Sequence, residues 1–196
     1  MEMLLFIRFI LNTPLLLLYL FSSKKPLIRG DVKHWSMRHC RSGSFLYLLA
    51  ALLPQRPFRS VYYHRLNCGR LSEKLLWRLA ALFYPGESTL LIYTTDIGPG
   101  LFVQHGLATI IAARKIGANC MVHQQVTLGY TNHTDAPVIG DDVYIGCGAK
   151  VLGDVVVGDR VNIGANAVVI ANVPSDSTAV GVPARILPRR RIGGLS

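Results

Sequence analysis

Histidine and cysteine are the residues of this sequence best suited to chemistry near neutral pH. His105 lies between Gln104 and Gly106, directly after a short apolar stretch. A neutral imidazole can accept a proton from a hydroxyl group that is otherwise a poor nucleophile. A single histidine on a strand is more often structural, so His105 is a candidate general base that needs support from its surroundings.

The four cysteines are widely separated and form no Cys-x-x-Cys pair: Cys40, Cys68, Cys120 and Cys147. The spacing predicts neither a disulfide framework nor a zinc site, so we expect no bound metal and a reducing, cytoplasmic location. Cys147 is a weak candidate for a nucleophile.

The positive charge of the chain is concentrated at its two ends. Of the 196 residues 51% are hydrophobic and 16% charged, which excludes a disordered chain. Residues 1–87 hold 13 Lys and Arg against 4 Asp and Glu, a net +9, whereas residues 88–187 hold 5 against 7, a net −2. A basic region that is also rich in Leu and Phe favours a membrane surface or a packed helical cap, and no nucleic-acid-binding motif appears.

Residues 1–30 form an apolar N-terminal segment with three possible interpretations. Residues 3–21 are mostly apolar but are interrupted by Arg8 and by Asn12, Thr13 and Pro14. The segment packs on the protein, lies peripherally at the cytoplasmic face of a membrane with its basic residues at the head groups, or spans the bilayer. A cleavable signal peptide fits poorly.

Residues 31–86 are predicted to be helical. Asp31 is a candidate N-terminal cap for a helix through Val32 and Trp35. A second apolar helix is expected before Pro54, and apolar residues at helical spacing predict a third over Leu71–Phe83, ended by Pro85 and Gly86.

From residue 97 onward the sequence repeats every six residues. A buried aliphatic position leads each repeat, usually followed by Gly and, four positions after the lead, by Val or Ala. The leads are Ile139, Ile145, Val151, Val157, Ile163 and Val169, with further runs Leu91, Ile97 and Val103, and Ile110, Ile116, Val122 and Leu128. This period fits short strands with a corner after each, three of which close one coil of a β-helix.

Two breaks interrupt this repeat. The step from Val103 to Ile110 is seven residues, and the step from Leu128 to Ile139 is eleven. The second break extrudes a loop over residues 129–138. Insertions in a regular coil mark the functional face.

The repeat region resembles the left-handed β-helix of hexapeptide-repeat acyltransferases, and is most similar to the serine acetyltransferase branch with its relatives in surface-polysaccharide synthesis. Four segments carry the resemblance: residues 97–106, 126–129, 143–153 and 179–186. The resemblance implies a mainly β fold after an α-helical region, a homotrimer, acetyl-CoA as co-substrate and a site between subunits.

The same resemblance assigns roles to individual residues. His105 is the catalytic base. Residues that bind the donor are Gly129, Tyr130, Thr131, Cys147, Ala165 and Arg185. Residues that contact the acceptor are Gln104, His133, Asp135 and Asp96. Asp96 and Glu87 are the candidate carboxylates for orienting His105.

Three positions depart from the serine acetyltransferase pattern. Gln104, Asp135 and Ala136 stand where that branch has an acidic residue, an arginine and a second histidine. We therefore expect the acceptor to be a sugar hydroxyl in surface-polysaccharide biosynthesis and L-serine to be a poor acceptor. Serine O-acetylation in cysteine biosynthesis is the alternative, and a non-catalytic scaffold is the second alternative.

The expected organisation has four parts. The apolar segment 1–30 precedes a helical region over 31–86, the β-helix domain covers 88–187, and 188–196 form a basic tail. The expected partners are a small-molecule or glycan acceptor, two further copies of the chain, and the inner face of a membrane.

Overall fold

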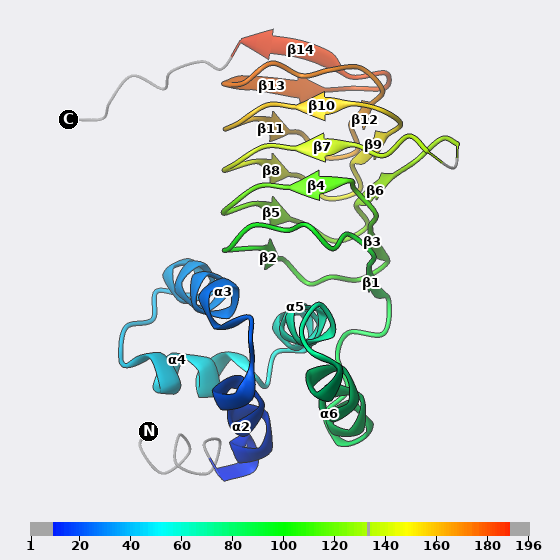
Figure 1. Cartoon of the computed structure of the whole chain (residues 1–196). Helices are drawn as coiled ribbons and strands as arrows, with labels where there is room; N and C mark the ends of the chain where they lie inside the picture. Colours follow the sequence, from blue (N-terminus) through cyan, green and yellow to red (C-terminus); the bar gives the residue numbers. More distant parts are fainter. Residues whose placement is uncertain (1–9, 133, 189–196) are drawn as a thin grey trace, which may run out of the picture.

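The protein consists of a helical base and a triangular coil of short strands stacked on it (Figure 1). The computed structural model describes residues 10–132 and 134–188. The helices are α2 (Thr13–Phe21), α3 (Lys25–Arg38), α4 (Phe45–Leu52), α5 (Arg56–Asn67) and α6 (Leu71–Phe83). The predicted fold class, a β-helix of hexapeptide repeats after a helical region, is confirmed.

The helices begin where the sequence favours a start. Proline stands in the first turn of α2, α3 and α5, where its missing N–H costs no hydrogen bond. The third predicted helix has the bounds expected for it, Leu71–Phe83. α3 runs through residue 30, so the boundary expected there between two segments falls inside a helix.

α2, which lies in the described part of the apolar N-terminal segment, packs on the helical base. Leu15, Leu16 and Tyr19 are buried, and the hydroxyl of Tyr62 donates to the carbonyl of Leu15 at 2.8 Å. Within residues 10–132 and 134–188, no helix combines the length and apolar character that crossing a bilayer requires.

The strands form three sheets, one on each side of the triangle. The first contains β1 (Leu90–Ile92), β3 (Thr109–Ile111), β6 (Thr127–Gly129), β9 (Lys150–Leu152) and β12 (Val168–Val169). The second contains β4 (Lys115–Ile116), β7 (Val138–Ile139) and β10 (Val156–Val157). The third contains β2 (Phe102–Val103), β5 (Met121–Val122), β8 (Tyr144–Ile145), β11 (Asn162–Ile163), β13 (Ser177–Val180) and β14 (Arg185–Pro188).

All pairings are parallel except that of β14, which lies antiparallel to β13 and ends the third sheet. The six leading aliphatic residues from Ile139 to Val169 are at most 1% exposed, so they form the interior of the coil as the period predicts.

The predicted phase is wrong in the first coil. Leu91 and Ile110 were expected inside, but they are 41% and 37% exposed, and they pair with each other across β1 and β3. Leu90 and Ile111 point inward instead, and Ile111 pairs with Leu128. The inward step from Val103 therefore runs to Ile111, eight residues later (111 − 103).

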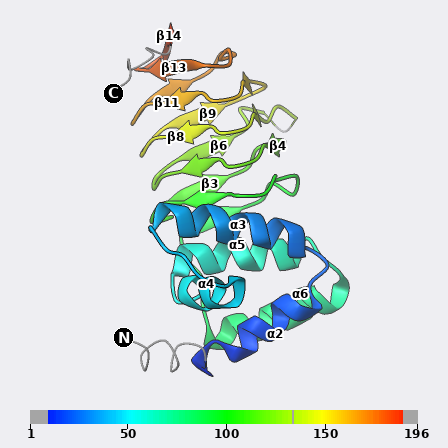
Figure 2. The same ribbon diagram turned by 90° about the vertical axis from the view of Figure 1, so that its left-hand side faces the viewer.

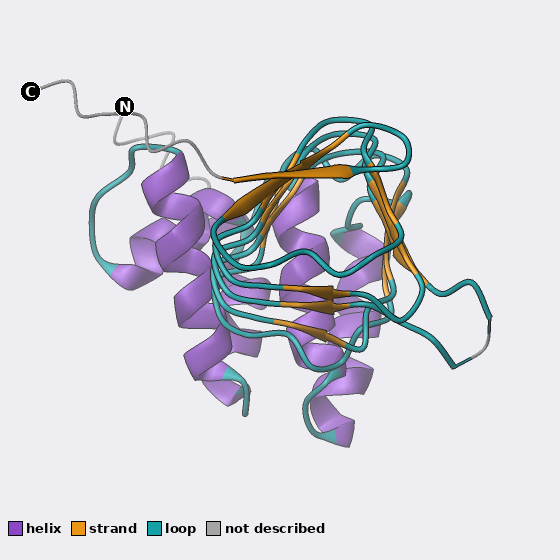
Figure 3. Cartoon of the chain, turned by 90° about the horizontal axis from the view of Figure 1, so that it is seen from above, coloured by secondary structure: helices purple, strands orange, loops and turns teal. Residues whose placement is uncertain are grey.

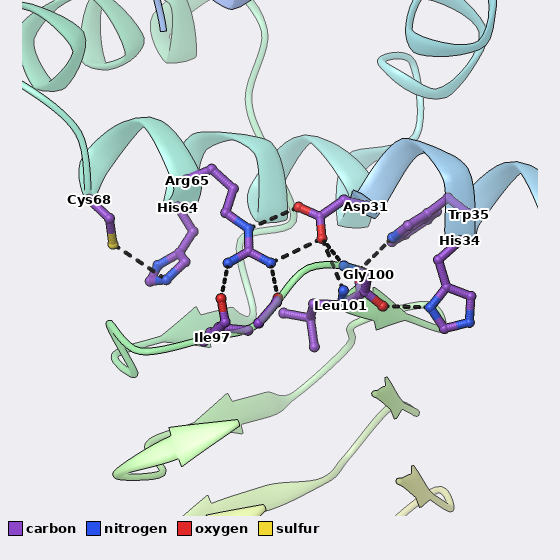
Figure 4. A network of polar contacts seen from close by, with 10 residues as sticks. Asp31, His34, Trp35, His64, Arg65, Cys68, Ile97, Gly100 and Leu101 are labelled. Atoms are coloured by element: carbon purple, nitrogen blue, oxygen red, sulfur yellow. Dashed lines mark hydrogen bonds and ion pairs between the residues drawn. The ribbon is translucent and has the colours of Figure 1, made fainter. Parts of the chain in front are cut away.

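Asp31 does not cap a helix. It lies inside α3, is 2% exposed, and forms a bidentate ion pair with Arg65 of α5, with N–O distances of 2.9 and 3.0 Å (Figure 4). Arg65 also donates to the carbonyls of Ile97 and Gly98, and the backbone N–H groups of Gly100 and Leu101 donate to Asp31. One buried pair thus fastens two helices to the first coil.

Replacing Asp31→Asn should lower the free energy of unfolding by about 3 kcal/mol. The variant keeps the shape of the side chain but leaves the Arg65 guanidinium buried without its counter-charge. Urea denaturation followed by circular dichroism measures the change.

Asp154→Asn is the matched control. It breaks the Arg114–Asp154 pair, which is shorter at 2.7 Å but has side chains that are 54% and 68% exposed. Solvent screens such a pair, so the loss should stay below about 1 kcal/mol. Equal losses in the two variants would show that the Asp31 pair does not fasten the coil.

Candidate active site

His105 occupies a strained turn at the end of β2. Its φ is 64°, and the N–H of Gly106 donates to the carbonyl of Gln104 at 2.8 Å, which closes a three-residue turn around the histidine. Such a γ-turn with a positive central φ is the rare form, and a non-glycine residue held there costs about 1–3 kcal/mol. The imidazole is exposed at a corner of the coil.

An extra residue in the first coil accounts for this turn. Val103 pairs with Val122, 19 residues later, whereas Ile145 pairs with Ile163, 18 residues later. The extra length falls at the corner after β2, where the inward step from Val103 to Ile111 is eight residues, and the next step, to Ile116, is shorter at five. Of the residues that stack on His105 in later coils, Gln124, Cys147 and Ala165 have no positive φ, and Gly181 at the last level has a φ of 95°. His105 is therefore the one non-glycine residue of this column held at a positive φ.

Two predicted donor-binding residues lie on the same edge of the coil as His105. Continuing the strand register from His105 gives Gln124, Cys147 and Ala165, and backbone bonds join these levels. The N–H of Gly148 donates to the carbonyl of Gln124 at 3.0 Å, and that of Asn166 to the carbonyl of Cys147 at 2.8 Å.

This edge is kept narrow by glycine. A Cβ added to Gly146, the residue before Cys147, would lie 2.7 Å from the backbone nitrogen of Ala165. Small residues therefore leave backbone groups accessible along the edge.

Arg185 lies at the far end of the same edge. Arg185 is exposed in β14 and pairs with Val180. The next residue, Gly181, continues the column that runs from His105 through Ala165. Four strand spacings separate β2 from β13, roughly 19 Å. His105, two small residues and an arginine thus follow one another along a single edge.

The extruded loop lies at a different corner of the triangle, between β6 and β7 (Figure 3). It carries Gly129, Tyr130 and Thr131, and Tyr130 is 58% exposed. His133 lies outside the described residues. Within one chain, the structure therefore does not bring the loop and His105 to the same corner.

Asp135 binds within its own loop. Its carboxylate accepts hydrogen bonds from the backbone N–H groups of Thr131 and Asn132, at 2.9 and 2.7 Å, and from the hydroxyl of Thr131. The hydroxyl of Thr131 is the main cause that lowers the pKa of Asp135. Its role toward an acceptor stays a prediction.

The nearest polar partner of His105 is Gln104, whose side-chain nitrogen lies 3.2 Å from Nε2 of the imidazole. An amide nitrogen only donates, so this contact places a lone pair on Nε2. Among the described residues no carboxylate is hydrogen-bonded to His105. Glu87 accepts from Thr89, and Asp96 is exposed.

Sequence reasoning missed His123 and Gln124. Nε2 of His123 and Oε1 of Gln124 are buried and lack a hydrogen-bond partner within the described part of the chain. Burial is the main cause that lowers the pKa of His123, followed by the charges of His105 and Arg38. His123 and Gln124 stand 19 residues after Gln104 and His105, which is the length of the first coil. The repeat could therefore have identified them as the residues stacked on Gln104 and His105.

Two other features bear on the location of the site. A cavity of about 360 Å³ between α5, α6 and β1 is lined by Glu87 but by none of the other predicted site residues. Over residues 10–132 and 134–188, no group of three or more His, Cys, Asp or Glu side chains is arranged to hold a metal ion.

Comparison with known proteins agrees with this geometry. The family described as bacterial transferase hexapeptide (six repeats) matches residues 136–171. A serine acetyltransferase of Staphylococcus xylosus is 48% identical over 104 residues, which cover 50% of this chain and 48% of the relative. The chain spans about half the length of the curated relatives it matches.

Solved structures match a larger part of the chain. Serine acetyltransferase of Neisseria gonorrhoeae in complex with serine has a TM-score of 0.66 and 28% identity, and the match covers 83% of this chain and 68% of that one. A serine acetyltransferase in complex with CoA has a TM-score of 0.64 and 26% identity, covering 84% and 70%.

The coil therefore matches the hexapeptide-repeat family of bacterial transferases over residues 136–171. The chain is similar to serine acetyltransferases in sequence and in fold, which supports the resemblance that the sequence indicated.

The expected acceptor, a sugar hydroxyl in surface-polysaccharide biosynthesis, is wrong. The relatives and neighbours compared above are named serine acetyltransferases, which also contradicts the expectation that L-serine is a poor acceptor. The error came from interpreting Asp135 as an inverted charge at the acceptor. Its carboxylate is occupied by Thr131 and Asn132, so its sign does not reveal the acceptor.

His105→Asn should lower the rate of acetyl transfer by about 10²–10⁴-fold while leaving the fold intact. Asparagine tolerates a positive φ but cannot act as a base near neutral pH. Release of CoA thiol measures the rate.

His105→Gly tests the strain separately. Glycine adopts a positive φ without steric cost, so its thermal midpoint should not fall below that of the wild type. If either variant at position 105 kept a rate of acetyl transfer within tenfold of the wild type, His105 would not be the general base.

Proposed function

We propose that this chain is an acetyl-CoA-dependent serine O-acetyltransferase in which His105 is the general base. The observation that carries the proposal is the position of His105. It is presented by a strained turn at one end of an edge that continues through small residues to Arg185. The similarity of the coil to serine acetyltransferases supports the choice of acceptor.

The reaction follows from the lone pair on Nε2 of His105. The serine hydroxyl replaces the Gln104 amide at Nε2, and the imidazole takes its proton as the oxygen attacks the thioester carbonyl. A tetrahedral oxyanion forms and collapses, the carbon–sulfur bond breaks, and the CoA thiolate takes the proton from the imidazolium. The ester O-acetylserine and CoA are the products.

The donor is proposed to lie along the edge that His105 begins. Its pantetheine arm would pass the backbone of Cys147 and Ala165, and Arg185 would meet the phosphates of CoA. The structural neighbour in complex with CoA supports a CoA site in proteins of this shape.

We propose a homotrimer with its sites between subunits. The loop residues Gly129, Tyr130 and Thr131 lie at another corner than His105, so a neighbouring copy has to supply them to the site. In this arrangement Asp135 of one copy would face the acceptor of the next, together with Gln104 and Asp96. Four free thiols fit a cytoplasmic location.

Association with the cytoplasmic face of a membrane stays a prediction. Apolar side chains are exposed along α6 and α2: Leu71, Leu75, Leu79, Leu82, Phe83, Leu17, Leu20 and Phe21. Contact with another copy of the chain would also cover these side chains.

Incubating the purified chain with acetyl-CoA and L-serine tests the function. We expect saturable release of CoA and formation of O-acetylserine, identified by mass spectrometry. The His105→Asn variant gives the background rate, which corrects for spontaneous hydrolysis. Absence of saturable acetylation of L-serine in the wild type, under conditions in which acetyl-CoA binds, would refute the proposal.

A further inference from the structure

The acceptor site of the proposed reaction needs a cation, because free serine carries a carboxylate. In the coil, Arg114 and Arg160 are paired with Asp154 and Asp176, and the Lys150 ammonium donates to the carbonyl of Gln125. The coil has two further basic residues. Lys115 lies in β4 of the second sheet, not in the third sheet that His105 follows, and Arg185 lies at the far end of the edge. The helical base, which lies below His105, is therefore the next place to look for a cation that could bind the serine carboxylate.

α3 and β2 run in the same direction. Along α3, Asp31 contacts Gly100 and Leu101, the indole N–H of Trp35 donates to the carbonyl of Leu101 at 2.8 Å, and the His39 ring lies 6.0 Å from the Phe102 ring. Figure 4 shows Asp31, Trp35 and His34 following one another above the strand.

The last turn of α3 therefore lies beside the end of β2, where Gln104 and His105 follow. In Figure 2, α3 extends beneath the coil below the third sheet, to which β8 and β11 belong.

Arg38, the last residue of α3, is held by one of its three nitrogens. Nδ1 of His34 lies 2.5 Å from the carbonyl oxygen of Gly100 and must donate to it, which leaves a lone pair on Nε2. Nε of Arg38 donates to that Nε2 at 3.3 Å. The two terminal nitrogens of the guanidinium stay available, and no carboxylate among the described residues is ion-paired with Arg38.

The electrostatics agree with this position. The charges of both His105 and Arg38 act on the imidazole of His123 and contribute to its lowered pKa, after the larger effect of burial. The charges of Arg38, on the helical base, and of His105, on the coil, therefore both act on this half-buried ring.

We propose that Arg38 receives the carboxylate of the acceptor and so determines specificity for an amino acid. The inference rests on the proposed function. Two parallel hydrogen bonds from the terminal nitrogens would hold the carboxylate, while the hydroxyl of the same molecule reaches Nε2 of His105. His34 is the positioning residue that orients the guanidinium.

Steady-state kinetics of Arg38→Gln with two acceptors test this role. The KM for L-serine should rise roughly 10- to 100-fold, because charge-assisted hydrogen bonds are lost. For 2-amino-1,3-propanediol, which replaces the carboxylate by a hydroxymethyl group, the KM should change less than about twofold. His34→Phe should raise the KM for L-serine by a smaller factor.

Lys33→Gln is the matched control, since it removes one charge from an exposed position of the same helix. Its kinetic constants should equal those of the wild type, and circular dichroism verifies the folding of each variant. An unchanged KM for L-serine in Arg38→Gln, or an equal rise for both acceptors, would overturn the inference. A wild type that does not acetylate L-serine would instead refute the proposed function.

Discussion

The buried ion pair between Asp31 and Arg65 joins the two parts of the molecule. Removing two charges from water is costly, and the cost is recovered here because the carboxylate accepts from Arg65 and from the backbone of Gly100 and Leu101. Burial raises the pKa of Asp31 against the opposing effect of these donors. The network fixes α3 along β2, and the position of α3 decides which of its side chains lie near His105.

A second constraint is the length of the first coil. One residue more than the regular 18 cannot be placed in a flat side of the triangle, so it is taken up at a corner as a strained turn. The turn aims the imidazole outward, and the stability that it costs is supplied by the regular coils above. Fold and site are therefore coupled, because the regular coils stabilise the strained corner that presents His105.

The period made the coil predictable from sequence because each repeat is local and buries the same kind of residue. The phase of the first coil was not predictable in this way, because an inward step of eight residues after Val103, in place of six, leaves Ile110 outside and puts Ile111 inside. Asp31 resembled a helix cap because its partner Arg65 and its coil contacts are 34 and 69–70 residues away. The acceptor was predicted wrongly because a loop residue, Asp135, satisfies its charge locally, which no spacing reveals.

The crystal structure of His105→Asn with CoA and L-serine bound would test the account most directly. The account predicts a serine carboxylate about 3 Å from the terminal nitrogens of Arg38, with the serine hydroxyl facing position 105. It also predicts CoA along the edge formed by Cys147 and Ala165. Serine bound away from α3, or CoA on another edge of the coil, would contradict it.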